Sequence, residues 1–173
     1  MDSINREQPE QNRADLVGSE AVEKVQKLVE KAGSGFFTTH DGRTRPMAVQ
    51  TVDDRGHLWF LSASDSHKNL TLAQDPTVRM FFQGSAHAEF LSLECSATVS
   101  VDRQKIDELW KPILKTWFTE GKEDPRITVI ELTPRSGYYW DTKHGKAVAG
   151  VKTVVGAAIG VTLDDSIEGT LSF

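Results

Sequence analysis

LSLECSATVSV, residues 91–101, alternates apolar and polar side chains along its whole length. Successive side chains of a β-strand point to opposite faces, so the pattern predicts one long strand with a single buried face. The apolar side chains that share this face are Leu91, Leu93, Cys95, Ala97, Val99 and Val101. Such a strand needs neighbours to pair with, and the flanking sequence supplies them.

Shorter runs rich in β-branched and aromatic residues lie on both sides of this stretch. They are FFTTH (36–40), TRPMAVQTV (44–52), HLWFL (57–61), TVRMFF (77–82), RITVIELTP (126–134) and GYYWD (137–141). Turn residues at 41–42 and 54–56 predict hairpins between the first of these runs. Because most connections are of hairpin length and only three helices are predicted, the sequence favours a mainly β fold, an antiparallel barrel, over a parallel α/β sheet.

Two longer segments have apolar residues at helical spacing. The first runs from Ser19 to Lys31, with Ser19 as the predicted N-cap and Gly33 as the stop. The second follows Asp102, its predicted N-cap, and Pro112 is expected to divide it in two. A third, shorter helix is expected with His67 and Lys68 in its first turn.

Composition is typical of a globular protein. The chain has 173 residues, a net charge of −5 and one cysteine, and no apolar run approaches the roughly 20 residues of a membrane span. We therefore expect neither nucleic acid nor membrane as a partner, no disulfide, no metal site, and a reducing cytoplasm as the compartment. The expected parts are a disordered tail at 1–18, one barrel domain at 19–155 and an extension of uncertain structure at 156–173.

Two predicted strands carry apolar residues on both faces. Trp59 and Phe60 are adjacent in the first, and the second contains Ile127, Val129, Ile130 and Leu132. One face can fill the barrel, and the other needs a different cover. Because large exposed apolar patches usually mark an interface, this pattern predicts a homodimer.

The segment 58–76, LWFLSASDSHKNLTLAQDP, carries the strongest signal for a binding site. It predicts a strand, a turn rich in hydroxyl groups and a helix with His67 and Lys68 in its first turn. The start of a helix suits a phosphate group, and Lys68 adds a full charge. The hydroxyl donors are Ser62, Ser64 and Ser66. The alternative is that Asp65 or Ser66 only caps the helix and that Lys68 is solvated.

Two further segments are open to more than one interpretation. Arg43 and Arg45 are two residues apart, which would place them on the same face of one strand before Pro46. An arginine here could reach a phosphate, or the two could belong to an exposed hairpin arm. The aromatic cluster 138–140 could stack on a planar heterocycle, or could be core or interface material. The sequence contains no nucleophile elbow, P-loop or dinucleotide fingerprint, and Cys95 is predicted to be a buried, inert thiol.

Together, four segments resemble the pyridoxamine 5′-phosphate oxidase-like FMN-binding split barrels, and within them the bacterial general stress proteins. These segments are RPMAVQ (45–50), LWFLSASDSHKNLTLAQDPTVRMFF (58–82), LWKPILKTWFTEGKEDPR (109–126) and GYYWD (137–141). The resemblance implies FMN, or FAD, in a cleft between two subunits of a homodimer. It implies a redox role with an electron donor that the sequence does not identify.

The resemblance also implies which residues bind the flavin. The segment along the ring is Arg45, Pro46, Met47, Ala48, Val49 and Gln50, with Arg45 near the phosphate. Leu61 and Ser62 match the pair before the turn, and His67 and Lys68 match the phosphate-binding Arg-Lys pair. Trp140 matches an aromatic side chain that walls the flavin from the partner subunit.

One departure from the family pattern concerns the reaction. The oxidases have an Arg-x-His motif after the matched tryptophan, whereas this chain continues DTKHGK (141–146). We therefore expect no oxidation of pyridoxamine 5′-phosphate. The alternatives are a non-enzymatic module that binds or senses flavin, an oxidase of the pyridoxamine 5′-phosphate type, and a dimer whose pocket has lost its ligand.

Overall fold

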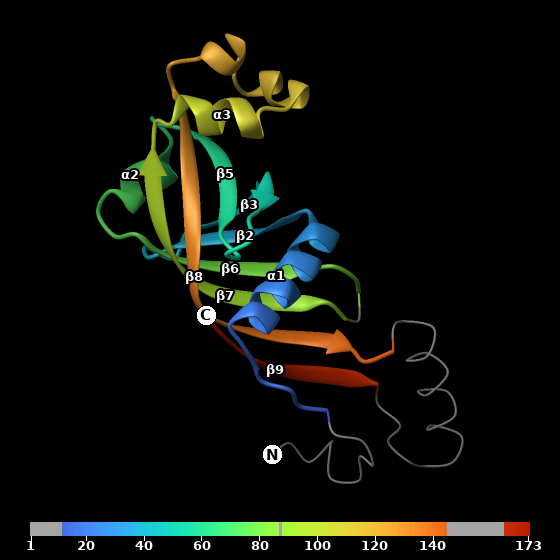
Figure 1. Ribbon diagram of the computed structural model, residues 1–173. Coiled ribbons are helices and arrows are strands. Elements are labelled where there is room, and N and C mark those ends of the chain that lie inside the picture. The colour runs from blue at the N-terminus through green and yellow to red at the C-terminus, as the bar shows by residue number, and fades with distance from the viewer. Residues whose placement is uncertain (1–11, 87, 145–164) are drawn as a thin grey trace.

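Nine strands form one mixed sheet in the computed structural model, which describes residues 12–86, 88–144 and 165–173. The strands are β1 (Leu16–Val17), β2 (Ser34–Thr39), β3 (Thr44–Ala48), β4 (Thr51–Val52), β5 (Leu58–Ala63), β6 (Thr77–Gln83), β7 (Phe90–Ser100), β8 (Ile127–Thr142) and β9 (Ser166–Ser172). The helices are α1 (Ser19–Ala32), α2 (His67–Leu72) and α3 (Arg103–Leu109), with 3-10 turns η2 (Pro112–Thr116) and η3 (Gly121–Glu123). Figure 1 shows α3, η2 and η3 at one end of the molecule and β9 at the other.

Strand pairing makes most of this sheet barrel-like, with an opening between β3 and β5. The sheet runs β8-β7-β6-β2-β3, β8 also pairs with β5, and β5 pairs with β4. The chain passes directly from β3 to β4 through Val49 and Gln50, whose N–H groups donate to Gly33 O and Trp59 O. The prediction of a mainly β fold is confirmed, and the mixed sheet is consistent with the predicted barrel. The prediction of an antiparallel sheet holds for every pair except β1 and β9, which are parallel.

The strand β8 connects the barrel to the rest of the sheet. The segments 126–134 and 137–141, predicted as separate strands, are one strand of 16 residues. Its register with β7 shifts where Glu94 lies opposite Ser136 and Cys95 opposite Pro134, which leaves Arg135 as an extra residue. A bulge of this kind accommodates a proline, which cannot donate a ladder hydrogen bond. The first half of β8 pairs with β5 and the second half with β9.

The helix α1 packs one side against the barrel core. Its buried residues are Ala21, Val25, Leu28 and Val29. Gly33 ends the helix in the left-handed conformation with φ 68°, as predicted. The predicted cap at Ser19 is wrong, because the helix already begins at Ser19 and its N-cap is Gly18, which has no side chain to accept a bond.

The segment 103–123 builds a second, smaller core outside the barrel. Asp102 caps α3 by accepting a bond from Lys105 N at 3.0 Å, and Pro112 begins η2, both as predicted. Apolar side chains of this segment pack against the outer faces of β5 and β8. The buried residues of this outer core are Ile106, Leu109, Leu114, Phe118, Ile127 and Val129.

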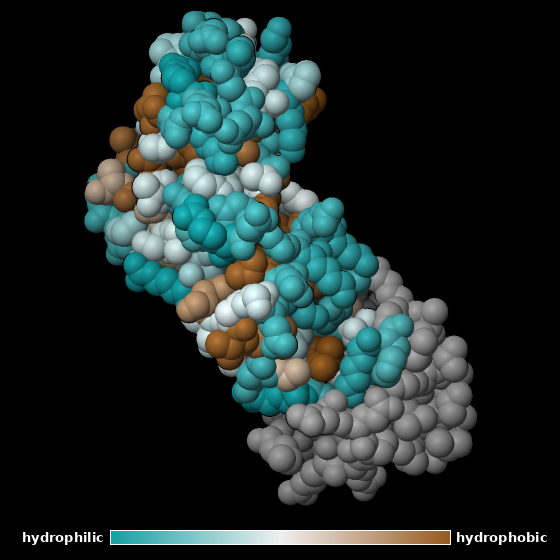
Figure 2. All heavy atoms as spheres, in the orientation of Figure 1, coloured by the Kyte–Doolittle hydropathy of each residue, from teal (hydrophilic) through white to brown (hydrophobic). Residues whose placement is uncertain are grey.

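The outer core corrects one sequence-based argument. The second apolar face of the strands around Trp59 and Val129 is covered by the chain itself and not by a second subunit, because 103–123 folds back over it. The pattern of those two strands therefore gives no evidence for a dimer. In the space-filling view the tip of this segment is mostly hydrophilic, with hydrophobic residues at the surface below it (Figure 2).

The two ends of the described chain lie against each other. Residues 12–18 were expected within a disordered tail, but Leu16–Val17 pairs with β9, and Ala14 N donates to Glu168 O at 2.9 Å. Gly169 allows this approach, since a Cβ there would lie 1.9 Å from Ala14 O. The rest of the expected tail, residues 1–11, lies outside the described residues.

Two further expectations concern the buried face of one strand and membrane-spanning segments. The predicted buried face of 91–101 is buried only as far as Cys95, and Val101 is 62% exposed, because the strand runs beyond the core there. Among the described residues, no helix is long and apolar enough to cross a membrane.

Candidate functional site

A cavity of about 370 Å³ opens between β3, β5, α2 and η2. We call it the β3–β5 cavity. Its walls are mostly apolar, as in typical sites for small molecules. The lining residues are Pro46, Met47, Ala48, Gln50, Leu61, Ser62, Ala63, Lys68, Leu114, Trp117 and Phe118. The cavity thus brings together the two segments that the sequence singled out, 45–50 and 58–76.

Lys68 lines this cavity, and Arg45, which is next to the lining residue Pro46, is close enough to act on its charge. Burial of the Lys68 ammonium lowers its pKa from the ordinary value, and the positive charge of Arg45 lowers it further. Arg45 Nη1 is buried and has no hydrogen-bond partner among the described residues. Lys68 Nζ donates only a long bond, 3.4 Å, to Ser66 Oγ. Two partly desolvated cations with unused donors are suited to an anion such as a phosphate group.

Buried hydrogen bonds hold α2 against the barrel beside these cations. Ser66 caps the helix by accepting a bond from Asn69 N. Ser62 Oγ donates to Asn69 Oδ1 at 2.7 Å, and Asn69 Nδ2 donates to Thr128 Oγ1 at 2.8 Å. Thr128 Oγ1 in turn donates to Ser62 O at 2.9 Å. Ser62 and Ser66 therefore position Lys68, and their hydroxyls are already engaged within the protein.

Other residues proposed from the sequence lie away from the β3–β5 cavity. Ser64 is exposed in the turn, and His67 is exposed with Nδ1 3.0 Å from Thr71 Oγ1. Val49 lines a different cavity, of about 530 Å³, between α1 and β4. Arg43 precedes β3 and pairs with Asp41 at 3.7 Å, so it does not accompany Arg45. The sequence spacing had placed both arginines on one strand, but the strand begins only at Thr44.

The cover of the cavity was missed by sequence reasoning. Leu114, Trp117 and Phe118 come from η2 and the residues after it. Trp117 is 64% exposed, and Lys111 Nζ donates to Gln50 O at 3.3 Å beside it. The signal was present, since 109–126 was one of the segments of the resemblance. Its place over β5 could not be read from helical spacing.

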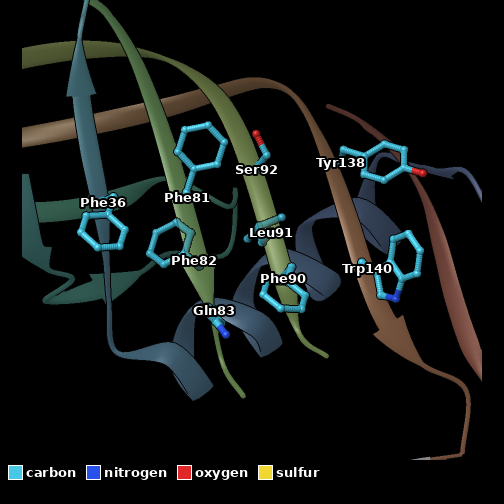
Figure 3. A pocket seen from close by; sticks show the side chains of 9 residues that line it. All are labelled: Phe36, Phe81, Phe82, Gln83, Phe90, Leu91, Ser92, Tyr138 and Trp140. Atoms are coloured by element: carbon cyan, nitrogen blue, oxygen red, sulfur yellow. The ribbon is translucent and has the colours of Figure 1, made fainter. Parts of the chain in front are cut away.

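Trp140 lies at a third hollow, of about 460 Å³, on the outer face of the sheet. Two cross-strand rows of side chains line it, as Figure 3 shows. One row places Phe36 opposite Phe81, Phe81 opposite Ser92, and Ser92 opposite Tyr138. The other row is Gln83, Phe90 and Trp140. We call this surface the aromatic face.

The aromatic face is exposed and borders the β3–β5 cavity. Phe36 is 58% exposed and Trp140 40% exposed. Pro46, which lines the cavity, lies opposite Phe36 in the sheet and so extends the first row. Desolvation raises the pKa of Tyr138 to about 12, and its hydroxyl donates to Glu168. The face is therefore apolar and uncharged at neutral pH along its centre.

The β3–β5 cavity has little chemistry of its own. Lys68 is the one ionisable side chain in its lining, among the residues that the structure describes. Cys95 lies in the barrel core, and burial raises the pKa of its thiol to about 12, which keeps it protonated at neutral pH, as the sequence predicted for an inert thiol. The arrangement can bind and orient a ligand, and any redox chemistry must come from the ligand.

The chain is similar in sequence and in structure to known proteins. A protein-family model described as pyridoxamine 5′-phosphate oxidase like matches residues 20–164. A solved structure described as a general stress protein 26 from Jannaschia sp. CCS1 is 24% identical and covers 87% of this chain and 97% of its own, with a TM-score of 0.76. The general stress FMN/FAD binding protein from Xanthomonas citri is 28% identical, with coverages of 66% and 84% and a TM-score of 0.58.

A curated relative gives a shorter match. Protein bli-3 of Neurospora crassa is 28% identical over 118 residues, which are 60% of this chain. The matched region spans 56% of that protein, so the chain corresponds to little more than half of it.

Proposed function

The chain belongs to the pyridoxamine 5′-phosphate oxidase-like family, and from that membership we propose that it binds FMN, or FAD, in the β3–β5 cavity. The observation that carries the proposal is the mostly apolar cavity lined by the partly buried Lys68, with the charge of Arg45 close to it and a buried Arg45 Nη1 that has no partner among the described residues. A relative that is 28% identical is described as an FMN/FAD binding protein.

The residues of the cavity fit the two ends of a flavin nucleotide. Arg45 Nη1 is a buried donor without a partner, and Gln50 Oε1 is a buried acceptor without one among the described residues. They lie at opposite ends of the segment 45–50. A flavin nucleotide has a phosphate at one end and a ring N–H donor at the other. It could therefore satisfy both orphan groups, each of which is costly while it stays unpaired.

The chemistry of the proposed function belongs to the cofactor. When bound, a flavin supplies hydride or electron transfer by itself. The protein would bind the phosphate through Arg45 and Lys68 and orient the ring along Met47 to Gln50. Trp117 and Phe118 would keep water from the ring. The proposal includes a redox role with a small-molecule electron donor. Consumption of a reduced nicotinamide cofactor by flavin-loaded protein would support this role, whereas a module that only binds or senses flavin would consume none.

The proposal includes a homodimer with the flavin between its subunits. The aromatic face is exposed in the part of the chain that the structure describes, and it borders the cavity through Pro46. A second copy placed on this face would bury its phenylalanines and would bring Trp140 of the partner subunit toward the flavin. Interfaces of stable dimers are enriched in such aromatic residues.

The proposal excludes pyridoxamine 5′-phosphate as a substrate. Asp141, which follows Trp140, is buried and accepts from Lys24 Nζ at 3.1 Å, with Lys27 Nζ at 3.7 Å. His144 is basic too, but its Nδ1 lies 2.7 Å from Asp165 Oδ1. The described part of this stretch is therefore engaged within its own chain, and the sequence lacks the Arg-x-His motif of the oxidases. We expect no sustained formation of pyridoxal 5′-phosphate by flavin-loaded protein with oxygen. Turnover of many equivalents would contradict this.

The test of flavin binding separates the phosphate from the ring. Lys68→Ala should weaken FMN about 10- to 150-fold, the equivalent of a charge-assisted hydrogen bond, while riboflavin binding changes little. Flavin fluorescence quenching measures both. Arg43→Ala is a matched control, since this arginine belongs to the same hairpin but pairs with Asp41. Equal losses for FMN and riboflavin, or no flavin binding by the unaltered protein, would overturn the proposal.

A further inference from the structure

A cluster of three potential metal ligands lies at the opposite end of β5 from the β3–β5 cavity. Asp53 and His57 belong to the turn between β4 and β5, and Glu131 belongs to β8. One ligand atom from each lies within 4.8 Å of the other two, and this is the only such trio in the part of the chain that the structure describes. His57 Nδ1 is 2.6 Å from Glu131 Oε1.

The Asp53 carboxylate is already held in a fixed orientation. Its Oδ1 accepts bonds from the backbone N–H groups of Arg55 and His57, both at 2.9 Å. Its Oδ2 accepts from Trp59 Nε1 at 3.2 Å. Outer hydrogen bonds of this kind orient metal ligands in known sites. His57 and Glu131 are also partly buried, with side chains 16% and 23% exposed.

A cation already occupies this cluster. The Arg55 guanidinium lies 3.2 Å from Asp53 Oδ2 and 3.4 Å from Glu131 Oε1, so it compensates both carboxylates. Its side chain is 67% exposed and can turn outward without disturbing the core. The cluster is thus arranged around a positive charge that another cation can replace.

We propose that Asp53, His57 and Glu131 form a site for a divalent transition metal such as Zn²⁺, which displaces the Arg55 side chain. One imidazole nitrogen and two carboxylate oxygens are ligands that Zn²⁺ accepts, with a water in the fourth position. The metal would tie the β4–β5 turn to β8 and would act independently of flavin. Sequence spacing could not reveal the site, because Glu131 follows His57 by 74 residues.

Isothermal titration of the flavin-free protein with Zn²⁺ tests the site. We expect one ion per chain for the unaltered protein. His57→Gln and Glu131→Gln should each weaken binding by more than about 100-fold, beyond the range of losses measured for outer-shell changes. Arg55→Ala should instead tighten binding about 2- to 5-fold, because it removes the cation that competes with Zn²⁺. The gain is small because exposed ion pairs, such as those that Arg55 makes, are weak.

The other hairpin supplies matched controls. Asp41 and Arg43 form a similar ion pair in the turn between β2 and β3. This turn contains His40, but neither His40 nor Asp41 belongs to a trio of ligand atoms among the described residues. Asp41→Asn and Arg43→Ala should therefore leave Zn²⁺ binding unchanged. Co²⁺ should quench the fluorescence of Trp59, and Trp59→Phe should remove that part of the quenching. Melting of each metal-free variant checks its fold. Three results would overturn the proposal. The unaltered protein could fail to bind Zn²⁺, the His57 or Glu131 variant could bind Zn²⁺ as tightly as the unaltered protein, or Arg55→Ala could bind it more weakly.

Discussion

Two stretches of the outer barrel surface are similarly apolar, but the chain covers only one of them. On the first half of β8 and on β5, side chains such as Val129 and Trp59 lie beneath the segment 103–123. On β2, β6, β7 and the second half of β8, the aromatic face is exposed, with Phe36 and Trp140 among its members. The same strand, β8, carries both kinds of surface.

The difference shows that an apolar strand face does not by itself indicate what covers it. A cover from the same chain contributes to folding stability, whereas an exposed face can contribute only when a partner binds. Substitutions on the two surfaces should therefore have different consequences. The first two predictions below test this directly, and two smaller ones concern the start of the cover and the neighbouring β3–β5 cavity.

The largest effect is expected beneath the cover. Ile106 is fully buried in the outer core, and Ile106→Ala should lower the free energy of unfolding by about 2–5 kcal/mol through the cavity it leaves. Ile113→Ala is the control, since Ile113 lies in the same segment and is 66% exposed. Denaturant unfolding measures both. Equal effects of the two substitutions would show that the outer core contributes no stability.

The next effect concerns association rather than folding. Phe81→Glu places a charge in the centre of the aromatic face and should weaken the proposed dimer by about 30-fold or more, as loss of an interface hot spot does. Sedimentation of the variant should show monomers that keep the native circular dichroism spectrum. Val101→Glu is the control outside this face. A dimer that survives Phe81→Glu would place the interface elsewhere.

A smaller effect is expected at the start of the cover. Asp102 caps α3, and Asp102→Ala should cost about 1 kcal/mol of stability, whereas Asp102→Asn retains a capping oxygen and should cost less. Thermal unfolding of the two variants gives the difference. An identical loss in both would mean that the carboxylate acts through its charge and not as a cap.

The smallest effect has the opposite sign. Burial and Arg45 lower the pKa of Lys68 in the folded protein, so the folded state holds this proton less tightly than the unfolded state. Stability of the flavin-free protein is therefore reduced below the folded-state pKa and recovers as the pH rises toward the unfolded value. Lys68→Met should raise the melting temperature at neutral pH and flatten its rise at alkaline pH. A lower melting temperature at neutral pH would contradict this.

Local features of the fold could be predicted from the sequence because they depend on neighbouring residues. The stop at Gly33, the cap at Asp102 and the division at Pro112 all follow from the conformational preferences of single residues. The joining of 126–134 and 137–141 into one strand could not be predicted. It depends on the pairing of Pro134 with a strand that lies about forty residues earlier.

In the candidate site, too, some residues could be predicted from the local sequence and others could not. Lys68 and the segment 45–50 carried local signals, namely charge, hydroxyls and a proline, and the barrel brings them to one cavity. Asn69 and Thr128, which fix α2, are common polar residues whose importance comes only from their burial together. Trp117 could be recognised as unusual, but its place over β5 depends on the tertiary packing of 103–123.

The parallel pairing of β1 with β9 has a consequence for synthesis of the chain. Thr170 N donates to Asp15, 155 residues earlier, and at 5–20 residues per second a ribosome needs about 8–30 s to make the intervening chain. During that time the barrel strands up to β8 can pair, while β1 has no strand to join. Of the described strands, β1 and β9 are therefore the last that can pair on a nascent chain, and translation rate sets how long the N-terminal strand stays open to other partners.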